Sequence, residues 1–227
     1  MKTKTILSDL ETTFKQHANG EIAQWQTAYM KHQFQFFGIK TPVRAKLQKS
    51  IFNKYPIHTT RELISIVQTL WNQDEREYQY AAIDLLKQYK QLWDPGLLPI
   101  LEWCITTKSW WDSVDDLARL CVGPLLLLFP DYTTLMDEWI KSPHMWLRRS
   151  AIIFQLRYKQ KTNIPLLFSY CTQTMHEKEF FIRKAIGWAL RELSKTAPHD
   201  VLQFVETHKA HLSSISLKEA IKYLPSS

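Results

Sequence analysis

The sequence predicts an all-α fold, and three observations lead to this prediction. The 227-residue chain contains only five glycines, whereas sheet proteins and Gly-rich phosphate loops need glycine at special turns. Apolar residues recur at three- and four-residue spacing along nearly the whole chain, as on one face of an α-helix. No segment alternates polar and apolar residues in the manner of a half-buried strand.

Short breaks divide this periodicity into separate helices. Proline suits the first turn of a helix, and acidic or hydroxyl residues suit the N-cap, so each break also marks the next helix start. The breaks are Thr41-Pro42, Asp94-Pro95-Gly96, Gly123-Pro124, Phe129-Pro130-Asp131, Ser142-Pro143 and Ala197-Pro198. Helices are expected over residues 11–17, 22–37, 42–53, 59–71, 75–90, 95–106, 113–121, 132–141, 145–159, 164–173, 178–195 and 200–208.

Three of the expected helices resemble one another, which indicates an internal repeat. They are EREYQYAAIDLLKQYK at 75–90, WLRRSAIIFQLRYKQK at 146–161 and FFIRKAIGWALRELSK at 180–195. Their alignment gives a step of about 35 residues, with segment 111–120 filling the gap. Stacked helix pairs of this length form an α-solenoid. Because the tetratricopeptide signature is missing, we expect compact HEAT-like repeats in a single domain over residues 1–227, with a concave groove.

The repeat step places distant residues at one equivalent position. Separations of 35, 34 and 35 residues relate Tyr80, Asp115, Arg149 and Lys184. Equivalent positions in a solenoid line one surface, commonly the concave one. The spacing therefore predicts a carboxylate flanked by cations, or alternatively a structural ion pair between Asp115 and Arg149.

A second register concerns aromatic residues. It relates Trp111, Trp146 and Phe181, and an aromatic that recurs at one repeat position is typical of packing between repeats. Trp188 follows Lys184 by one helical turn and is expected either on the same surface or in the core. Gly187, unusual inside a helix, predicts a close approach by another backbone, of protein or of DNA.

Composition narrows the choice of function. The formal net charge is +7, which fits a solvated basic surface or an anionic partner, with nucleic acid ahead of membrane. No GxGxxG or GxxxxGK[ST] motif occurs, so no nucleotide cofactor is indicated. The three cysteines lack metal-ligand spacing. The chain shows no apolar signal core and no membrane-length run, so we expect a cytoplasmic protein without metal, cofactor or membrane partner.

The most distinctive segment is Thr107-Lys108-Ser109-Trp110-Trp111-Asp112-Ser113-Val114-Asp115-Asp116. Two adjacent tryptophans and three acids stand together in an otherwise basic chain. In a helix, residues four apart project from one face, so an aromatic plate at 111 lies beside a carboxylate at 115. Such a pair suits an enzyme that holds a flat or cationic group next to negative charge.

With this segment the chain resembles the bacterial DNA alkylation repair family of HEAT-like DNA glycosylases, the AlkD-like proteins. The matching strings are Tyr29-Met30-Lys31 through Phe37-Gly38-Ile39-Lys40-Thr41-Pro42, and residues 107–115, 146–160 and 179–191. The strings Lys-Ser-Trp-Trp-Asp-Ser-Val-Asp and Ala185-Ile186-Gly187-Trp188 are the most specific.

The resemblance implies a site and a reaction. The family's catalytic aspartate matches Asp115, its active-site tryptophans match Trp111 and Trp188, its cleft arginine matches Arg149, and its DNA-approaching tyrosine matches Tyr29. The implied reaction is excision of N3- or N7-alkylated purines from duplex DNA. The Asp115 carboxylate would stabilise an oxocarbenium-like sugar, and pairing with the arginine would keep that acid ionised.

Basic residues cluster where the implied DNA groove should lie, although about half of them are expected to be merely solvated. The DNA-binding candidates are Tyr29, Lys40, Thr41, Arg44, Arg148, Arg157, Lys159, Lys184 and Arg191. The expected partner is alkylated double-stranded DNA, bound by a monomer in the cytoplasm at the nucleoid. The alternative is a non-catalytic α-solenoid module that binds DNA structures or an acidic protein.

Overall fold

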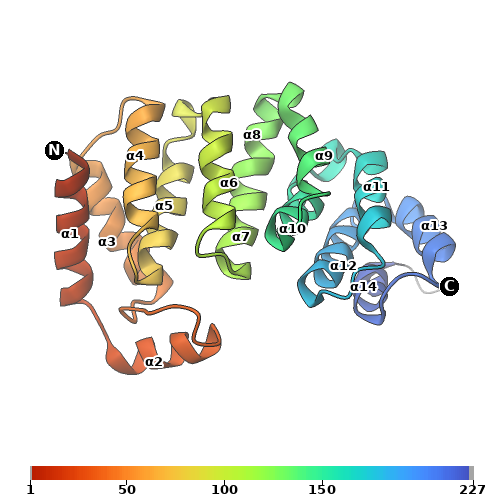
Figure 1. Ribbon diagram of the computed structural model, residues 1–227, viewed down its shortest axis with the longest axis horizontal. Helices are drawn as coiled ribbons and strands as arrows, with labels where there is room; N and C mark the ends of the chain where they lie inside the picture. Colours follow the sequence, from red (N-terminus) through yellow and green to blue (C-terminus); the bar gives the residue numbers. More distant parts are fainter. Residues whose placement is uncertain (1, 225–227) are drawn as a thin grey trace. The chain divides into compact units, whose positions relative to one another are not determined.

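The computed structural model describes residues 2–224, and over this range the protein is all-helical (Figure 1). The predicted all-α fold is confirmed. Within the described residues, pairing of the β type is limited to one isolated bridge between Gln35 and Glu75. The chain forms two compact units, Met1–Ile100 and Leu101–Ser227. The expectation of one domain over 1–227 stays a prediction.

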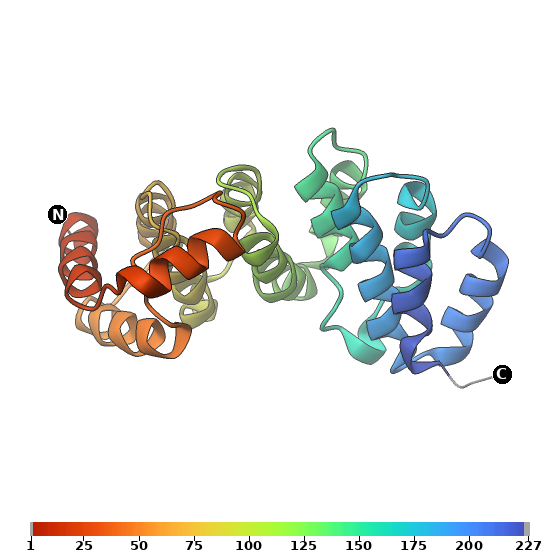
Figure 2. The ribbon, with the colours of Figure 1, turned by 90° about the horizontal axis from the view of Figure 1, so that it is seen from below.

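The first unit contains five α-helices followed by two 3₁₀ turns. The helices are α1 (Lys2–Gln16), α2 (Gly20–Tyr29), α3 (Thr41–Lys54), α4 (Thr60–Trp71) and α5 (Arg76–Gln88), and the turns are Lys90–Leu92 and Pro95–Leu97. Helices α1, α3, α4 and α5 pack against one another, whereas α2 lies across one end of them (Figures 1 and 2). The packed helices each turn an apolar face inward, as Ile6, Leu10 and Phe14 of α1 do.

The second unit continues from α6 (Leu98–Thr106), which crosses the division between the units. Three more elements run on without a break: α7 (Trp111–Leu117), a π-helical turn (Ala118–Val122) and α8 (Gly123–Leu128). Then follow α9 (Leu135–Trp139), α10 (Met145–Ile153), α11 (Ile164–Thr174), α12 (Phe180–Ser194), α13 (Pro198–His208) and α14 (Ser214–Ala220). Helix α7 packs on α10, α10 on α12, and α12 on α14, in the order that stacked repeats require.

Besides the start of α1, which lies at Lys2 and not at residue 11, four larger differences separate the helices from the sequence prediction. The helix expected over 22–37 ends at Tyr29, because the buried carboxylate of Glu77 accepts the N–H groups of Phe37, Gly38 and Ile39 at 3.0–3.1 Å. These bonds give the connecting segment partners outside a helix. The helix expected to reach residue 159 ends at Ile153.

The other two differences follow from local chemistry. Gly123-Pro124 does not break the chain of helices, because a wider π turn carries α7 into α8 and the proline sits in the first turn, where no N–H is required. Helix α14 has no counterpart in the prediction. Its short length leaves little periodicity, and the Ser213 side chain caps it by accepting the Ser216 N–H at 3.1 Å.

None of the helices between residues 2 and 224 is long and apolar enough to cross a bilayer. Within the same range, no three His, Cys, Asp or Glu side chains form a group that could hold a metal ion.

Candidate active site

Helix α7 presents the two residues that the sequence singled out. Trp111 is its first residue and Asp115 lies one turn further on, so both side chains project from the same face. Trp110, just before the helix, has extended backbone (φ −157°, ψ 160°). Trp111 is partly exposed, and Asp115 is 8% exposed.

The predicted pair of Asp115 and Arg149 is confirmed. The Arg149 guanidinium, on α10, donates from Nε to Oδ1 at 2.7 Å and from Nη2 to Oδ2 at 2.8 Å. This fork-to-fork arrangement is the strongest geometry that arginine and a carboxylate adopt. The third donor, Nη1, goes to the carbonyl oxygen of Phe181 in the first turn of α12. One arginine therefore joins three helices of the second unit.

Burial decides the proton affinity of this carboxylate. Arg149 is only 4% exposed and Asp115 little more. Desolvation raises the pKa of Asp115, and the hydrogen bonds and charge of Arg149 only partly offset that rise. Burial thus opposes the effect of Arg149, and the expectation that the arginine keeps this acid ionised stays a prediction. The physical reason for this opposition is that removing a carboxylate from water penalises its charged form strongly.

The carboxylate nevertheless keeps capacity for another partner. About 12% of the Asp115 side chain reaches the surface. Each carboxylate oxygen has two lone pairs and gives one to Arg149, so one per oxygen remains. A cationic group that reached this opening would meet a fixed, oriented negative charge.

The two adjacent tryptophans have different surroundings. Trp110 packs between the repeats, against the two later members of the aromatic register. Its ring centroid lies 5.9 Å from that of Trp146 and 5.5 Å from that of Phe181, which themselves lie 4.9 Å apart. Because α7 begins only at Trp111, the extended Trp110 turns into the packing layer, and the partly exposed Trp111 takes the face that carries Asp115.

Helix α12 contributes Trp188, which is partly exposed. Its neighbours Gly187 and Ala189 are buried, so the tryptophan lies at the margin of the core rather than within it. The close approach predicted at Gly187 is confirmed, and the approaching chain is the protein's own. A Cβ at this position would lie 2.7 Å from Glu219 Cβ and 3.0 Å from the Ser216 carbonyl oxygen of α14.

Four of the predicted DNA-binding cations have acidic partners within the protein, and their contact with DNA stays a prediction. Arg44 is buried, donates to Asp84 at 3.3 Å and stacks over the Tyr80 ring at 4.6 Å. Lys184 and Arg191 share the carboxylate of Glu219.

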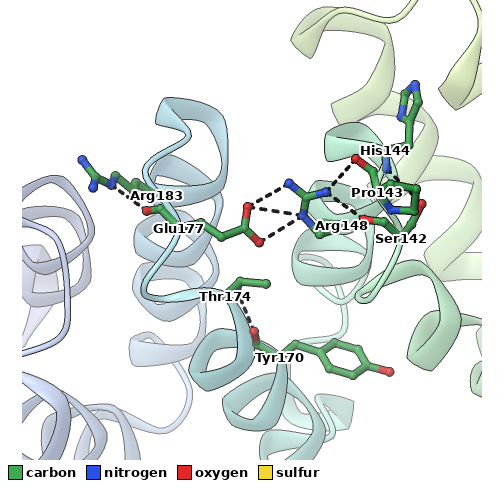
Figure 3. A network of polar contacts seen from close by, with 8 residues as sticks. All are labelled: Ser142, Pro143, His144, Arg148, Tyr170, Thr174, Glu177 and Arg183. Carbon is green, nitrogen blue, oxygen red and sulfur yellow. Dashed lines mark hydrogen bonds and ion pairs between the residues drawn. The ribbon is translucent and has the colours of Figure 1, made fainter.

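Arg148 is the fourth such cation, and Figure 3 shows its surroundings. Its guanidinium makes a fork with Glu177 at 2.9–3.3 Å and donates to the carbonyl oxygens of Ser142 at 2.7 Å and Pro143 at 3.0 Å (Figure 3). Nearly all of its donor capacity is used internally. Arg148 therefore holds the start of α10 against the end of α11.

The remaining predicted DNA contacts are exposed: Tyr29, Lys40, Thr41, Arg157 and Lys159. None of the three cations among them forms an ion pair with a described residue. Arg157 and Lys159 also border a cavity of about 880 Å³, together with Lys161. Leucines and Ile152 line its apolar part.

The equivalent positions extend further than the sequence analysis recognised. Arg44 precedes Tyr80 by 36 residues and Glu219 follows Lys184 by 35. Contacts link Arg44 with Tyr80, Asp115 with Arg149, and Lys184 with Glu219. The two ends were missed because α14 was not predicted and Arg44 was treated as a DNA contact, although the repeat spacing itself would have found them.

Comparisons with known proteins identify the family of the chain and proteins of similar structure. A family model described as DNA alkylation repair enzyme matches residues 10–224. The structure is similar to a predicted DNA alkylation repair enzyme from Enterococcus faecalis, with 35% identity, a TM-score of 0.85, and coverage of 92% of this chain and 98% of that one.

Two further structures share the fold at 16% identity. AlkD2 from Streptococcus mutans has a TM-score of 0.62, with 90% of this chain and 100% of that chain covered. The protein smu.31 from Streptococcus mutans UA159 has a TM-score of 0.63, with 93% and 100% covered. A comparison with curated proteins finds no match.

Proposed function

The chain belongs to the DNA alkylation repair enzyme family, and from that premise we propose that it is a monofunctional DNA glycosylase. It releases cationic N3- or N7-alkylated purines from duplex DNA and uses neither metal nor cofactor. The observation that carries the proposal is the carboxylate of Asp115, held by Arg149 at two points on the helix face that also bears Trp111.

The chemistry of the substrate explains why so small a site suffices. Alkylation of a purine ring nitrogen places positive charge on the base, so the base leaves readily and needs little general acid. The deoxyribose then develops oxocarbenium-like charge, as in glycoside hydrolysis. A fixed carboxylate stabilises that charge without reorganising, and it can orient the attacking water. Asp115 has the lone pairs for this role.

Positioning falls to the aromatic and exposed polar residues. The π faces of Trp111 and Trp188 attract a cationic nucleotide, with about 0.5–2 kcal/mol for each contact. Lys40, Arg157 and Lys159 contact phosphates without reading sequence, as a lesion-seeking enzyme requires. Tyr29 and Thr41 add polar contacts to the same backbone. The protein acts as a monomer at the nucleoid.

The direct test is base release from methylated duplex DNA. We expect the wild type to release 7-methylguanine or 3-methyladenine, and Asp115→Asn to slow release by about 10²–10⁴-fold while DNA affinity stays within about threefold. The matched control is Asp116→Asn, which alters the adjacent carboxylate that pairs with Arg119. Chromatography of the freed bases and a gel-shift titration supply the two readouts.

Folding must be separated from chemistry in this test, because Asp115→Asn leaves a buried arginine without its counter-charge. Thermal unfolding of each variant, and Asp115→Glu as a charge-preserving second variant, make that distinction. If the folded wild type releases no base from heavily methylated DNA, the glycosylase proposal is wrong.

One observation favours a second candidate. Both Asp115 oxygens bond to Arg149 and the residue is largely buried, as in a purely structural ion pair between repeats. The second candidate is therefore a non-catalytic helical-repeat module that binds DNA structures or an acidic protein. For such a module, Asp115→Asn changes stability but has no base release to abolish.

A further inference from the structure

We propose that Trp25 and Tyr29 of α2 form a stacking platform for an unstacked nucleobase of bound DNA, with Trp25 as the residue the base contacts. The proposal deepens the DNA-binding part of the proposed function and rests on DNA being the ligand. It concerns binding only, in the first unit of the chain, and requires no step at Asp115.

Helix α2 differs from the other helices of its unit because it contributes no buried residue. It carries the most exposed large apolar side chain among residues 2–224, Trp25 at 65%, and also Tyr29 at 53%. Aromatic side chains of this size normally supply core or interface area. A ten-residue helix is also marginal in isolation, so a surface helix of this kind needs a reason to keep two aromatics in water.

The helix is nevertheless held firmly at its start. Asn19 caps its start by accepting the Ile22 N–H at 3.0 Å and donates its own N–H to the Phe37 carbonyl at 2.9 Å. Gly38, with φ +84°, lies so close that a Cβ there would be 2.0 Å from the Asn19 carbonyl oxygen. The segment around Gly38 is bonded to the buried Glu77 carboxylate. The platform therefore stands on a fixed support.

The two rings are arranged in advance for stacking. Trp25 and Tyr29 are four residues apart on one helix face, with ring centroids 5.3 Å apart and planes only 11° from parallel. Tyr29 stacks on the indole, and at 65% exposure most of the Trp25 residue remains open to solvent. A planar base that stacked there would extend an existing stack, with little further loss of side-chain freedom.

The surroundings favour a nucleic-acid strand over a protein. Exposed Lys31 and His32 lie just beyond the buried Met30, both with left-handed backbone (φ 57° and 58°), and Lys40 is exposed where the connection ends. The two lysines suit the phosphates that flank a base. A protein interface would need a wider apolar patch, but the exposed neighbours Glu21, Gln24 and Ala28 are polar or small.

The test compares two unmethylated duplexes, one fully paired and one with a single bulged 2-aminopurine. We expect Trp25→Ala to weaken binding of the bulged duplex by about 5- to 100-fold and binding of the paired duplex by less than about twofold. Trp25→Phe should retain most of the affinity. Wild-type protein should quench 2-aminopurine fluorescence, and Trp25→Ala should not. Tyr132→Ala, which removes an exposed aromatic of the second unit, is the matched control.

Three results would overturn the platform: equal losses on both duplexes, no loss on either, or a change in self-association of Trp25→Ala in sedimentation that marks α2 as a protein interface. Because the DNA contains no alkylated base, a failed glycosylase assay leaves this measurement intact. The same titration with Asp115→Asn protein should give the same affinity for the bulged duplex, because the platform does not depend on the proposed catalytic residue.

Discussion

At the scale of single residues, the protonation of Asp115 links burial to activity. Desolvation raises its pKa above the ordinary value of 3.8, and Arg149 offsets only part of that rise. The folded state therefore binds this proton more tightly than the unfolded state does. The contribution of Asp115 to stability is present below the unfolded pKa and is lost as pH rises through the folded pKa.

The proposed chemistry needs the ionised form of Asp115, so the sign for activity is opposite. We expect base release to decline as pH falls through the raised pKa, at a higher pH than a solvent-exposed aspartate would produce. Single-turnover release measured across weakly acidic to neutral pH, with uncatalysed depurination subtracted, checks this. A rate that stays flat down to the ordinary aspartate range would count against Asp115 as the active carboxylate.

Glu77 is a second buried acid, and its carboxylate stabilises a segment of backbone. It is fully buried and accepts three consecutive N–H groups between α2 and α3. Glu77→Gln replaces one acceptor oxygen with a donor that faces N–H groups, so we expect a loss of about 2–5 kcal/mol in the free energy of unfolding. Urea denaturation measures it, with the exposed Glu206→Gln as control.

At the scale of elements, the contact between α12 and α14 depends on a glycine at position 187, which has no side chain to keep the helices apart. Gly187 allows the Ser216 backbone to approach, and the same interface carries the carboxylate of Glu219 between Lys184 and Arg191. Hydrogen bonding to Lys184 is the largest influence on Glu219, and together with the nearby cations it outweighs burial, so the pKa of Glu219 is lowered. The helix that the sequence did not predict thus completes the repeat series.

Gly187→Ala tests this contact. Alanine favours a helix by about 1 kcal/mol over glycine, but its methyl group would meet α14 at distances that real Cβ atoms do not show. We expect a net destabilisation of about 1–2 kcal/mol by thermal or urea unfolding. Gly20→Ala, with nothing within 4 Å of the added Cβ, should change stability far less. Equal effects from the two substitutions would refute the packing account.

At the scale of the whole molecule, the predicted DNA-binding cations fall into two groups within a chain of net charge +7. Arg44, Arg148, Lys184 and Arg191 are each engaged with an acid of another helix or of the loop after α11. Lys40, Arg157 and Lys159 are exposed without such a partner among the described residues. Salt dependence of binding distinguishes these two groups, because only phosphate contacts release counterions.

If Lys40, Arg157 and Lys159 each neutralise one phosphate, together they contribute about −3 to the slope of log affinity against log salt. Lys159→Gln should reduce the magnitude of the slope by about one, whereas Lys184→Gln, which removes a cation paired with Glu219, should leave it unchanged. Fluorescence anisotropy with a short duplex over a series of salt concentrations provides the data. A slope near zero would favour the acidic-protein partner.

The fold and the centre of the candidate site follow from the sequence to a large extent. Helical periodicity and scarce glycine predict the all-α class. Both can be read without knowing which helices pack together. The spacing of 34 residues between Asp115 and Arg149 predicts their pairing, because a repeat converts sequence distance into spatial equivalence. Position in a helix also predicts that Trp111 shares a face with Asp115.

Tertiary structure decided the rest. It placed Trp110 against Trp146, set the burial that raises the pKa of Asp115, and paired four cations with acids 28–40 residues away. Periodicity within a helix reports only which residues share a face. Desolvation and ion pairing depend on which helix faces are in contact. Those contacts are set by the packing of helices that are far apart in the chain.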